Sequence, residues 1–319
     1  MAEGLLAKDG SERTAPPRAR ARPRSAMRTR RALLGYLYLS PWLLGLVIFI
    51  LGPIIASAYL SLTEYDVLSQ PRFVGLENYR TAFFDDELFW PSLWRTLEYS
   101  VVMVPIGLFG SLSLALLLNQ RVRGANIFRT FYYLPSLTPG VALALIWTWL
   151  FHPSTGPVNE LLGWFGIEGP GWFQSTRWAL PSMIVVSLWA SLGGGTTVIF
   201  VAGLQGVPPA LLDAAQIDGA GPWQRLRHVT LPMISPTLLF NLVLGVIAAL
   251  KVFTLAFVAT KGGPAYATWF FALHIYTQAF EYFKMGYGAA LAWVFVVVLL
   301  AFTAVQLRLS RRWVYYEGE

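Results

Sequence analysis

Residues 32–60 read ALLGYLYLSPWLLGLVIFILGPIIASAYL, a stretch without a charged side chain. A helix needs about 20 mostly apolar residues to cross the hydrocarbon core of a bilayer, and this stretch is longer than that. A strand of a membrane β-barrel would be shorter and would alternate apolar with polar residues. The stretch therefore predicts a membrane-spanning helix.

Similar apolar blocks recur along the whole chain. Of its 319 residues 55% are hydrophobic and 13% are charged, and the mean hydropathy is +0.53. A soluble domain of this length carries about 25% charged residues. We predict an all-α, polytopic membrane protein with six transmembrane helices. They are expected at 32–60, 94–118, 130–151, 179–202, 233–258 and 284–307.

The basic residues predict how these helices cross the membrane. Residues 1–31 hold nine of the 24 Lys and Arg together with three prolines, which is typical of a disordered tail rather than a packed segment. Counting the tails and loops, seventeen basic residues fall on the side of this tail and six on the other. By the positive-inside rule both termini are cytoplasmic, and so are the loop 203–232 and the C-terminal tail 313–319. The membrane domain then covers 32–312.

Several other classes of function are disfavoured by the residues. The chain has no cysteine, and its three histidines, His152, His228 and His274, lack the spacing of metal ligands. It contains no G-x-x-x-x-G-K-[ST] loop for a nucleotide and no candidate catalytic residues. The net charge of +7 would indicate nucleic acid in a soluble protein, but here membrane topology explains it. We expect no nucleic-acid partner and no bound metal or cofactor.

The loop between the fourth and fifth predicted helices contains DAAQIDGAGPWQRLRHVTLP, residues 213–232. Pro209 and Pro222 can each start a helix, and Asp218-Gly219 is typical of a tight turn between them. The loop is therefore predicted to fold as helix, glycine turn and helix, with a partly apolar surface. Such an element could rest on lipid headgroups or could be gripped by a cytoplasmic protein.

This stretch resembles the cytoplasmic signature of permease subunits in bacterial ATP-driven (ABC) importers. The matching positions are Asp213, Ala214, Ala215, Asp218, Gly219, Ala220, Leu231 and Pro232. Asp213 departs from the usual Glu and keeps the carboxylate on a shorter stem. The stretches at 73–83, 128–162 and 261–292 are similar to the carbohydrate branch of the family, in particular to the first permease of maltose and glycerol-phosphate importers.

The resemblance implies a type I ABC importer permease fold and a subunit of the bacterial inner membrane. It implies four kinds of partner: a second homologous permease, two ATPase subunits, an extracytoplasmic solute-binding protein and membrane lipid. The ATPases would bind ATP and Mg and would dock through residues 209–232. This chain would form half of the pathway for a sugar or sugar derivative and would have no enzymatic activity of its own.

Four residues are candidates for the translocation pathway. Asn241 and Lys251 share a face of the fifth predicted helix, although Lys251 could instead be interfacial and snorkel to the membrane surface. Ser191 belongs to a stripe of small residues that close helix packing explains equally well. Trp147 could stack on a sugar ring or could belong to an interfacial aromatic belt.

Two alternative functions follow from the residues. A self-sufficient secondary transporter usually needs acids within the membrane, and the only acid in a predicted span is Glu98, near its start. A membrane enzyme using Asp213 and Asp218 as an acid–base or metal pair would lack a histidine spaced as a co-ligand. Both alternatives are weaker than the importer permease.

Overall fold

The computed structural model describes residues 24–120 and 125–315. Its contacts divide the chain into two units, Met1–Ala56 and Ser57–Glu319, which are described separately. The predicted N-terminal tail lies mostly outside the described residues, and so do 316–319 of the predicted C-terminal tail.

The N-terminal unit is helical throughout its described part. It consists of α1 (Arg24–Leu46), the wide turn η1 (Val47–Leu51) and the start of α2 (Gly52–Leu60). Pro41 inside α1 cannot donate to Leu37 O, and the Ser40 hydroxyl donates to that carbonyl instead, at 2.7 Å. The helix begins eight residues before the predicted span, because basic residues are good helix formers and do not end a helix.

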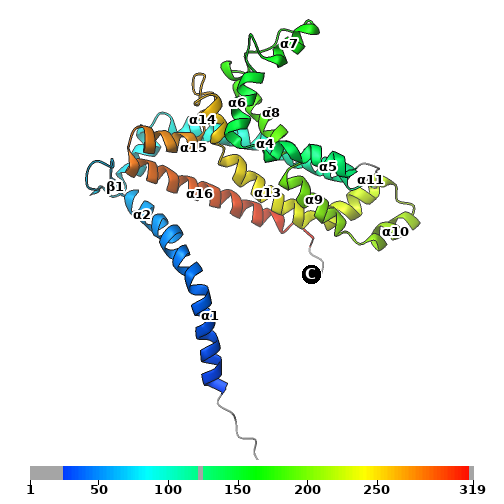
Figure 1. Ribbon diagram of the computed structural model, residues 1–319, viewed down its shortest axis with the longest axis horizontal. Helices are drawn as coiled ribbons and strands as arrows, with labels where there is room; N and C mark the ends of the chain where they lie inside the picture. The colour runs from blue at the N-terminus through cyan, green and yellow to red at the C-terminus, as the bar shows by residue number, and fades with distance from the viewer. Residues whose placement is uncertain (1–23, 121–124, 316–319) are drawn as a thin grey trace, which may run out of the picture. The chain divides into compact units, whose positions relative to one another are not determined.

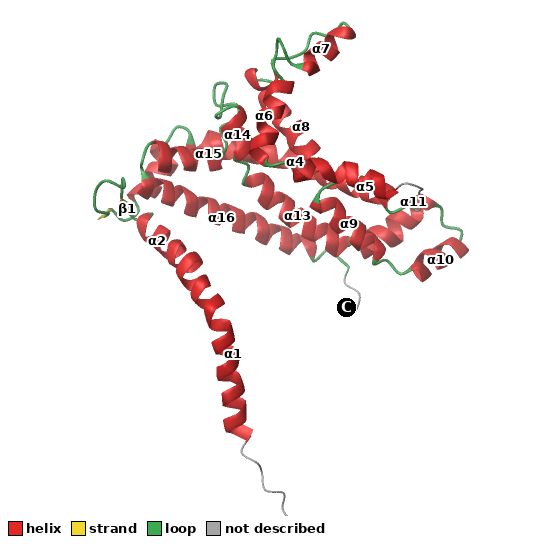
Figure 2. Ribbon diagram, viewed as in Figure 1, coloured by secondary structure: helices red, strands yellow, loops and turns green. Residues whose placement is uncertain are grey.

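In the part that the structure describes, the larger unit is mostly helical, with irregular loops and one short hairpin (Figure 2). After the hairpin come α3 (Glu77–Arg80), η2 (Thr81–Asp85), α4 (Phe89–Leu118), α5 (Ala125–Tyr133), η3 (Leu134–Leu137), α6 (Gly140–Leu150), α7 (Pro157–Trp164), η4 (Trp172–Gln174), α8 (Ala179–Ser191) and α9 (Gly195–Gln205). The second half holds α10 (Pro209–Ile217), α11 (Pro222–Arg225), η5 (Leu226–Thr230), α12 (Leu231–Met233), α13 (Ser235–Leu250), α14 (Thr254–Ala259), α15 (Phe271–Tyr276), η6 (Thr277–Glu281) and α16 (Met285–Ser310).

The predicted six spans agree with these helices, but three of them are interrupted. Within the described residues four helical stretches are long and apolar enough to cross a membrane, and six if each bent pair counts as one span. The bent pairs are the third span, which turns by 100° between Leu137 and Gly140, and the fourth, which turns by 48° between Ser191 and Gly195. The fifth span is broken between Leu250 and Thr254.

Helix α4 lies at the centre of the unit and contacts α8, α9, α13 and α15. Three apolar clusters surround it, one of them built from Ala115, Phe200, Leu204, Val207 and Ile234. Each cluster joins helices that are far apart in the sequence, so van der Waals packing between side chains, rather than the loops, holds these helices together in the membrane.

The bundle has two different ends (Figure 1). At one end β1 (Thr63–Glu64) pairs with β2 (Arg72–Phe73) in an antiparallel hairpin, which we call the hairpin end. At the other end α10 and α11 project from the bundle, which we call the knob end. Helix α16 begins near the hairpin and runs toward the knob end.

Candidate functional site

The three interrupted spans meet inside the larger unit. A Cβ placed on Gly193 would overlap the carbonyl oxygen of Tyr132, so the break of the fourth span packs directly against the end of α5. A Cβ on Gly140 would lie 3.4 Å from Thr254 Cγ2, so the starts of α6 and α14 are neighbours. We call residues 134–139, 192–194 and 251–253 together the joint.

Local sequence explains two of the three interruptions. Pro139 has no N–H and disfavours a helical residue before it, so the third span can restart only at Gly140. Gly193 adopts a φ of +85°, a left-handed conformation that side chains disfavour. The N–H of Gly193, freed by the break, donates to Thr197 Oγ1 at 3.1 Å. Irregular backbone at membrane depth is tolerated only inside protein or beside a water-filled cavity, which makes the joint a candidate pathway.

A cavity of about 190 Å³ lies between α4, α8, α9 and α13. Its polar lining comes from Tyr99, Ser111, Ser191, Thr196 and Asn241. The Asn241 side chain is buried and donates from Nδ2 to Thr237 O at 3.1 Å. The cavity thus brings together two of the four predicted pathway residues, Ser191 and Asn241.

The structure places the other two elsewhere. Trp147 packs in an aromatic cluster, with its ring centroid 4.8 Å from that of Phe151 and 5.5 Å from that of Trp189. Lys251 caps the end of α13, in the joint, and its side chain is exposed. Neither residue lines the cavity that holds Asn241.

The knob end folds as helix, turn and helix. Helix α10 ends at Ile217, Gly219 takes a φ of +80°, and α11 starts at Pro222. A side-chain hydrogen bond of 3.1 Å from Arg225 to Gln216 Oε1 ties the two helices together. The second helix of the knob continues through the wide turn η5 and α12 to Met233, and the wide turn before Pro232 accommodates the missing N–H.

The knob is fixed to the bundle and exposes apolar side chains. Leu212 and Leu231 pack against the cluster of Phe200 and Ile234. On the outside, Ile217 is 87% exposed and Trp223 is 69% exposed. The knob therefore offers two large apolar side chains to a partner or to lipid headgroups.

Four of the eight signature residues line a groove on the knob. The groove has a volume of about 310 Å³ and is lined by Ala215, Asp218, Gly219, Ala220, Gln224, Arg225, His228 and Val229. Asp213 and Ala214 are exposed on α10 beside it, whereas Leu231 faces the bundle. The knob therefore presents a concave surface on a rigid base.

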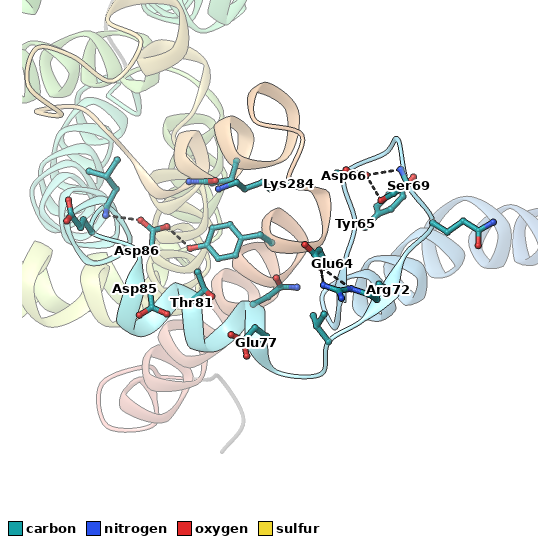
Figure 3. Close-up of a pocket in the computed structure, with 17 residues that line it drawn as sticks. Glu64, Tyr65, Asp66, Ser69, Arg72, Glu77, Thr81, Asp85, Asp86 and Lys284 are labelled. Atoms are coloured by element: carbon teal, nitrogen blue, oxygen red, sulfur yellow. Dashed lines mark hydrogen bonds and ion pairs between the residues drawn. The ribbon is translucent and has the colours of Figure 1, made fainter.

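The hairpin end carries an open cleft of about 1020 Å³ (Figure 3). Its carboxylates come from Glu64, Asp66, Glu77, Asp85, Asp86 and Glu87, against the two cationic side chains of Arg72 and Lys284. Glu64 forms an ion pair with Arg72, its partner across the hairpin. No cluster of three or more His, Asp or Glu side chains suited to a metal ion occurs among the residues that the structure describes.

Asp86 connects the cleft to the bundle. Its Oδ2 lies 2.8 Å from His274 Nε2 and accepts a 2.5 Å hydrogen bond from the Tyr287 hydroxyl, and its Oδ1 accepts the Leu88 N–H at 2.9 Å. Trp269 Nε1 donates to His274 Nδ1 at 3.2 Å, so the His274 proton that faces Asp86 is on Nε2. The Asp86 side chain is only 11% exposed. Nothing in the sequence around Asp86 indicated this network.

The hydrogen bonds at Asp86 predict an acid-sensitive contribution to stability. Burial alone would raise the pKa of Asp86, but the bonds from His274 and Tyr287 together outweigh it and lower the pKa from 3.8 to about 2. A lowered native pKa stabilises the fold above about pH 4, and this stabilisation is lost as the pH falls toward 2. We expect Asp86→Asn to cost about 1–2 kcal/mol at pH 7, after allowance for solvent screening.

The measurement is the thermal unfolding midpoint of the purified protein between pH 7 and pH 3. The difference between wild type and Asp86→Asn should shrink as the pH falls. Asp85→Asn is the matched control, because Asp85 lines the same cleft but is exposed and has no side-chain hydrogen bond among the described residues. Equal losses in both variants would contradict the role of the network.

Interrupted spans around a polar cavity, with an exposed apolar knob at one end, are typical of a membrane transport component. The comparison with known proteins is more specific. The chain belongs to the family of binding-protein-dependent transport system inner membrane components, which it matches over residues 103–315. The family resemblance expected from the signature loop is thereby confirmed.

Individual relatives cover nearly the whole chain. It is 39% identical over 291 residues to the probable ABC transporter permease protein YesP of Bacillus subtilis (strain 168), covering 90% of this chain and 93% of that protein. It is 35% identical over 281 residues to the sulfoquinovosyl glycerol transport system permease protein SmoG of Agrobacterium fabrum (strain C58), with 88% and 91% covered.

A solved structure is similar in fold. A chain in the crystal structure of a bacterial alginate ABC transporter, in complex with an alginate pentasaccharide-bound periplasmic protein, superposes with a TM-score of 0.80 at 25% identity. The match covers 90% of this chain and 96% of that chain. The predicted type I importer permease fold is confirmed. The chain is a permease subunit of a binding-protein-dependent importer, a transport component rather than an enzyme.

Proposed function

We propose that this chain forms half of the translocation pathway of a sugar importer, together with a second homologous permease. Two ATPase subunits, which bind ATP and Mg, would drive the pair, and one of them would dock on residues 209–232 of this chain. The observation that carries the proposal is the knob: it exposes Ile217 and Trp223 while Leu212 and Leu231 fix it to the bundle. A partner that grips a rigid element can move the bundle, whereas a flexible loop would absorb the motion.

The proposed orientation puts the knob end and both termini in the cytoplasm. The excess of basic residues in the N-terminal tail and in the loops on the knob side supports this orientation. The hairpin end would then face the solute-binding protein on the outer side. Its open acidic cleft offers polar surface for such a contact, and the alginate transporter in the similar crystal structure is itself bound to a periplasmic protein.

The proposed cargo is a sugar or sugar derivative. The support comes from the relatives, one named for sulfoquinovosyl glycerol transport and one for alginate. The cavity beside the joint adds side chains that suit a polyol, since the Asn241 amide and the Ser191 hydroxyl can both donate and accept hydrogen bonds. Asn241, Ser191 and Lys251 remain our candidate pathway residues, and Trp147 would serve only if its aromatic cluster opened.

The sidedness of transport tests this proposal. The permease pair would be co-expressed with its ATPases and reconstituted in vesicles with the knob side outward. Cargo release from the vesicles should require ATP outside and the solute-binding protein inside, and ATPase activity should rise several-fold when both are present. Transport that continues without any co-purified ATPase would refute the proposal. It would support a secondary transporter instead.

A further inference from the structure

We propose that Lys251 makes this permease selective for cargo with an anionic group, such as a carboxylate, sulfonate or phosphate carried by a sugar. The inference rests on the proposed function, because it assigns a substrate class to the pathway described above. It depends on three observations: the depth of Lys251 in the membrane, the direction in which it faces, and its lack of a counter-ion.

Lys251 lies inside a membrane-spanning segment. The candidate span runs over Ser235–Ala259, and Lys251 is the residue at which α13 ends. Sixteen residues of α13 rise about 24 Å from the knob side, so Lys251 lies below the far edge of a hydrocarbon core about 30 Å thick. A lysine in such a position is costly and indicates a functional site.

Lys251 also points away from the core of its own chain. The next two residues, Val252 and Phe253, pack on the central apolar cluster, whereas the Lys251 side chain is exposed. Ala248 lies one helical turn before it, is exposed in the same way and lines the cavity of Asn241. Residues three apart on a helix are neighbours, so Lys251 lies on the same helix face as Ala248, one turn beyond the cavity lining.

No described residue neutralises Lys251. Its side chain has no hydrogen bond or ion pair within the part of the chain that the structure describes. The acid of the second span, Glu98, is held by Arg95 at 2.7 Å near the start of α4. The cation therefore needs a partner from outside this chain, and an anionic cargo passing the joint supplies one.

The start of α6 contributes positive partial charge within the joint. The first N–H groups of α6 have no partner within that helix, and they carry the positive end of its dipole. Gly140 at this helix start lies beside Thr254, three residues after Lys251. An anionic group beside Lys251 would pair with its ammonium group, whereas a neutral sugar would leave the lysine unpaired.

The test uses the absence of cysteine, which makes the natural chain a clean background for single thiols. Ala248→Cys is introduced with Lys251 intact and with Lys251→Met, in the complex with its partner permease and ATPases. The probes are the anionic reagent 2-sulfonatoethyl methanethiosulfonate and the cationic reagent 2-(trimethylammonio)ethyl methanethiosulfonate. We expect the ratio of anionic to cationic reaction rates to fall about tenfold in the Lys251→Met background. Val297→Cys, on a 62% exposed position of α16, is the control and should not react.

Three outcomes would overturn the proposal. If the thiol of Ala248→Cys reacts with neither reagent in any nucleotide state, position 248 lies against lipid or protein rather than in a water-filled pathway. An unchanged rate ratio shows that Lys251 does not set the local potential. A complex that assembles with Lys251→Arg but not with Lys251→Met shows that the lysine pairs with a carboxylate of the partner permease.

A transport measurement gives an independent readout. Lys251→Cys should lower the import of a sugar that carries a carboxylate, sulfonate or phosphate at least tenfold. Modification with 2-aminoethyl methanethiosulfonate, which restores an ammonium group, should recover it, while methyl methanethiosulfonate should not. Recovery by both reagents would show that side-chain size rather than charge matters. Failure of the ATPases to co-purify with the wild-type chain would instead refute the proposed function itself, whatever the behaviour of Lys251.

Discussion

Ile217→Asp combined with Trp223→Asp should remove the ATPase from the purified complex. Both side chains are largely exposed on the knob, so the substitutions should leave the fold of the isolated chain intact. Central apolar anchors of an interface commonly contribute about 2 kcal/mol or more each, so each change alone should weaken the association at least about thirtyfold. Association is measured by co-purification, and coupling by the ATPase activity that the solute-binding protein stimulates.

Leu68→Asp is the matched control. Leu68 is 94% exposed but lies at the hairpin end, in the loop between β1 and β2. The Leu68→Asp substitution introduces the same charge at an equally accessible apolar position, so association with the ATPase should be unchanged. If the double variant kept its ATPase, or if Leu68→Asp lost it to the same extent, the knob would not be the docking element.

Among the substitutions that add one methyl group in the joint, Gly193→Ala should cause the largest loss of stability. The residue has a φ of +85°, and its Cβ would overlap the backbone oxygen of Tyr132, which no side-chain rotation can relieve. Strain and displaced packing together should cost about 3 kcal/mol or more. The thermal unfolding midpoint of the detergent-solubilised protein should fall by about 5 °C or more.

The same run of glycines provides the control. Gly195 has no atom within 4 Å of where a Cβ would stand and no positive φ, and it begins α9. Gly195→Ala should therefore be neutral or slightly stabilising, within about 1 kcal/mol. Equal midpoints for the two alanine variants would mean that Tyr132 and Gly193 are not in contact.

The knob could be predicted from the sequence because its signals are local. Pro209, Gly219 and Pro222 mark the two helix starts and the turn within fourteen residues. The apolar spans were equally readable, since length and hydropathy suffice to locate them. What the sequence did not indicate is which apolar side chains of the knob stay exposed, because Leu212 and Ile217 differ only in what packs against them.

Only part of the joint could be predicted from the sequence. The glycines at 193–195 and Pro139 are residues that favour an interruption of a helix. No nearby residues indicated, however, that the breaks of the three spans would lie next to one another. Asp86 and His274 are 188 residues apart, and their contact depends on how α4, α15 and α16 pack. Long-range packing of this kind decides the geometry of the candidate pathway, so the fold class was predictable while the site was not.

The bundle combines continuous and interrupted helices. Helices α4 and α16, with 30 and 26 residues, have no break, whereas the third, fourth and fifth spans do. If the proposed ATPase docks on the knob, its stroke would pass first to α9 and α13, to which the knob is connected. Because α9 begins and α13 ends at the joint, both would pivot there while α8 and α14, on the hairpin side of the breaks, kept their places. In that proposal the unbroken helices α4 and α16 would act as a frame, and the pathway would open by torsion at a few residues of the joint rather than by bending of whole helices.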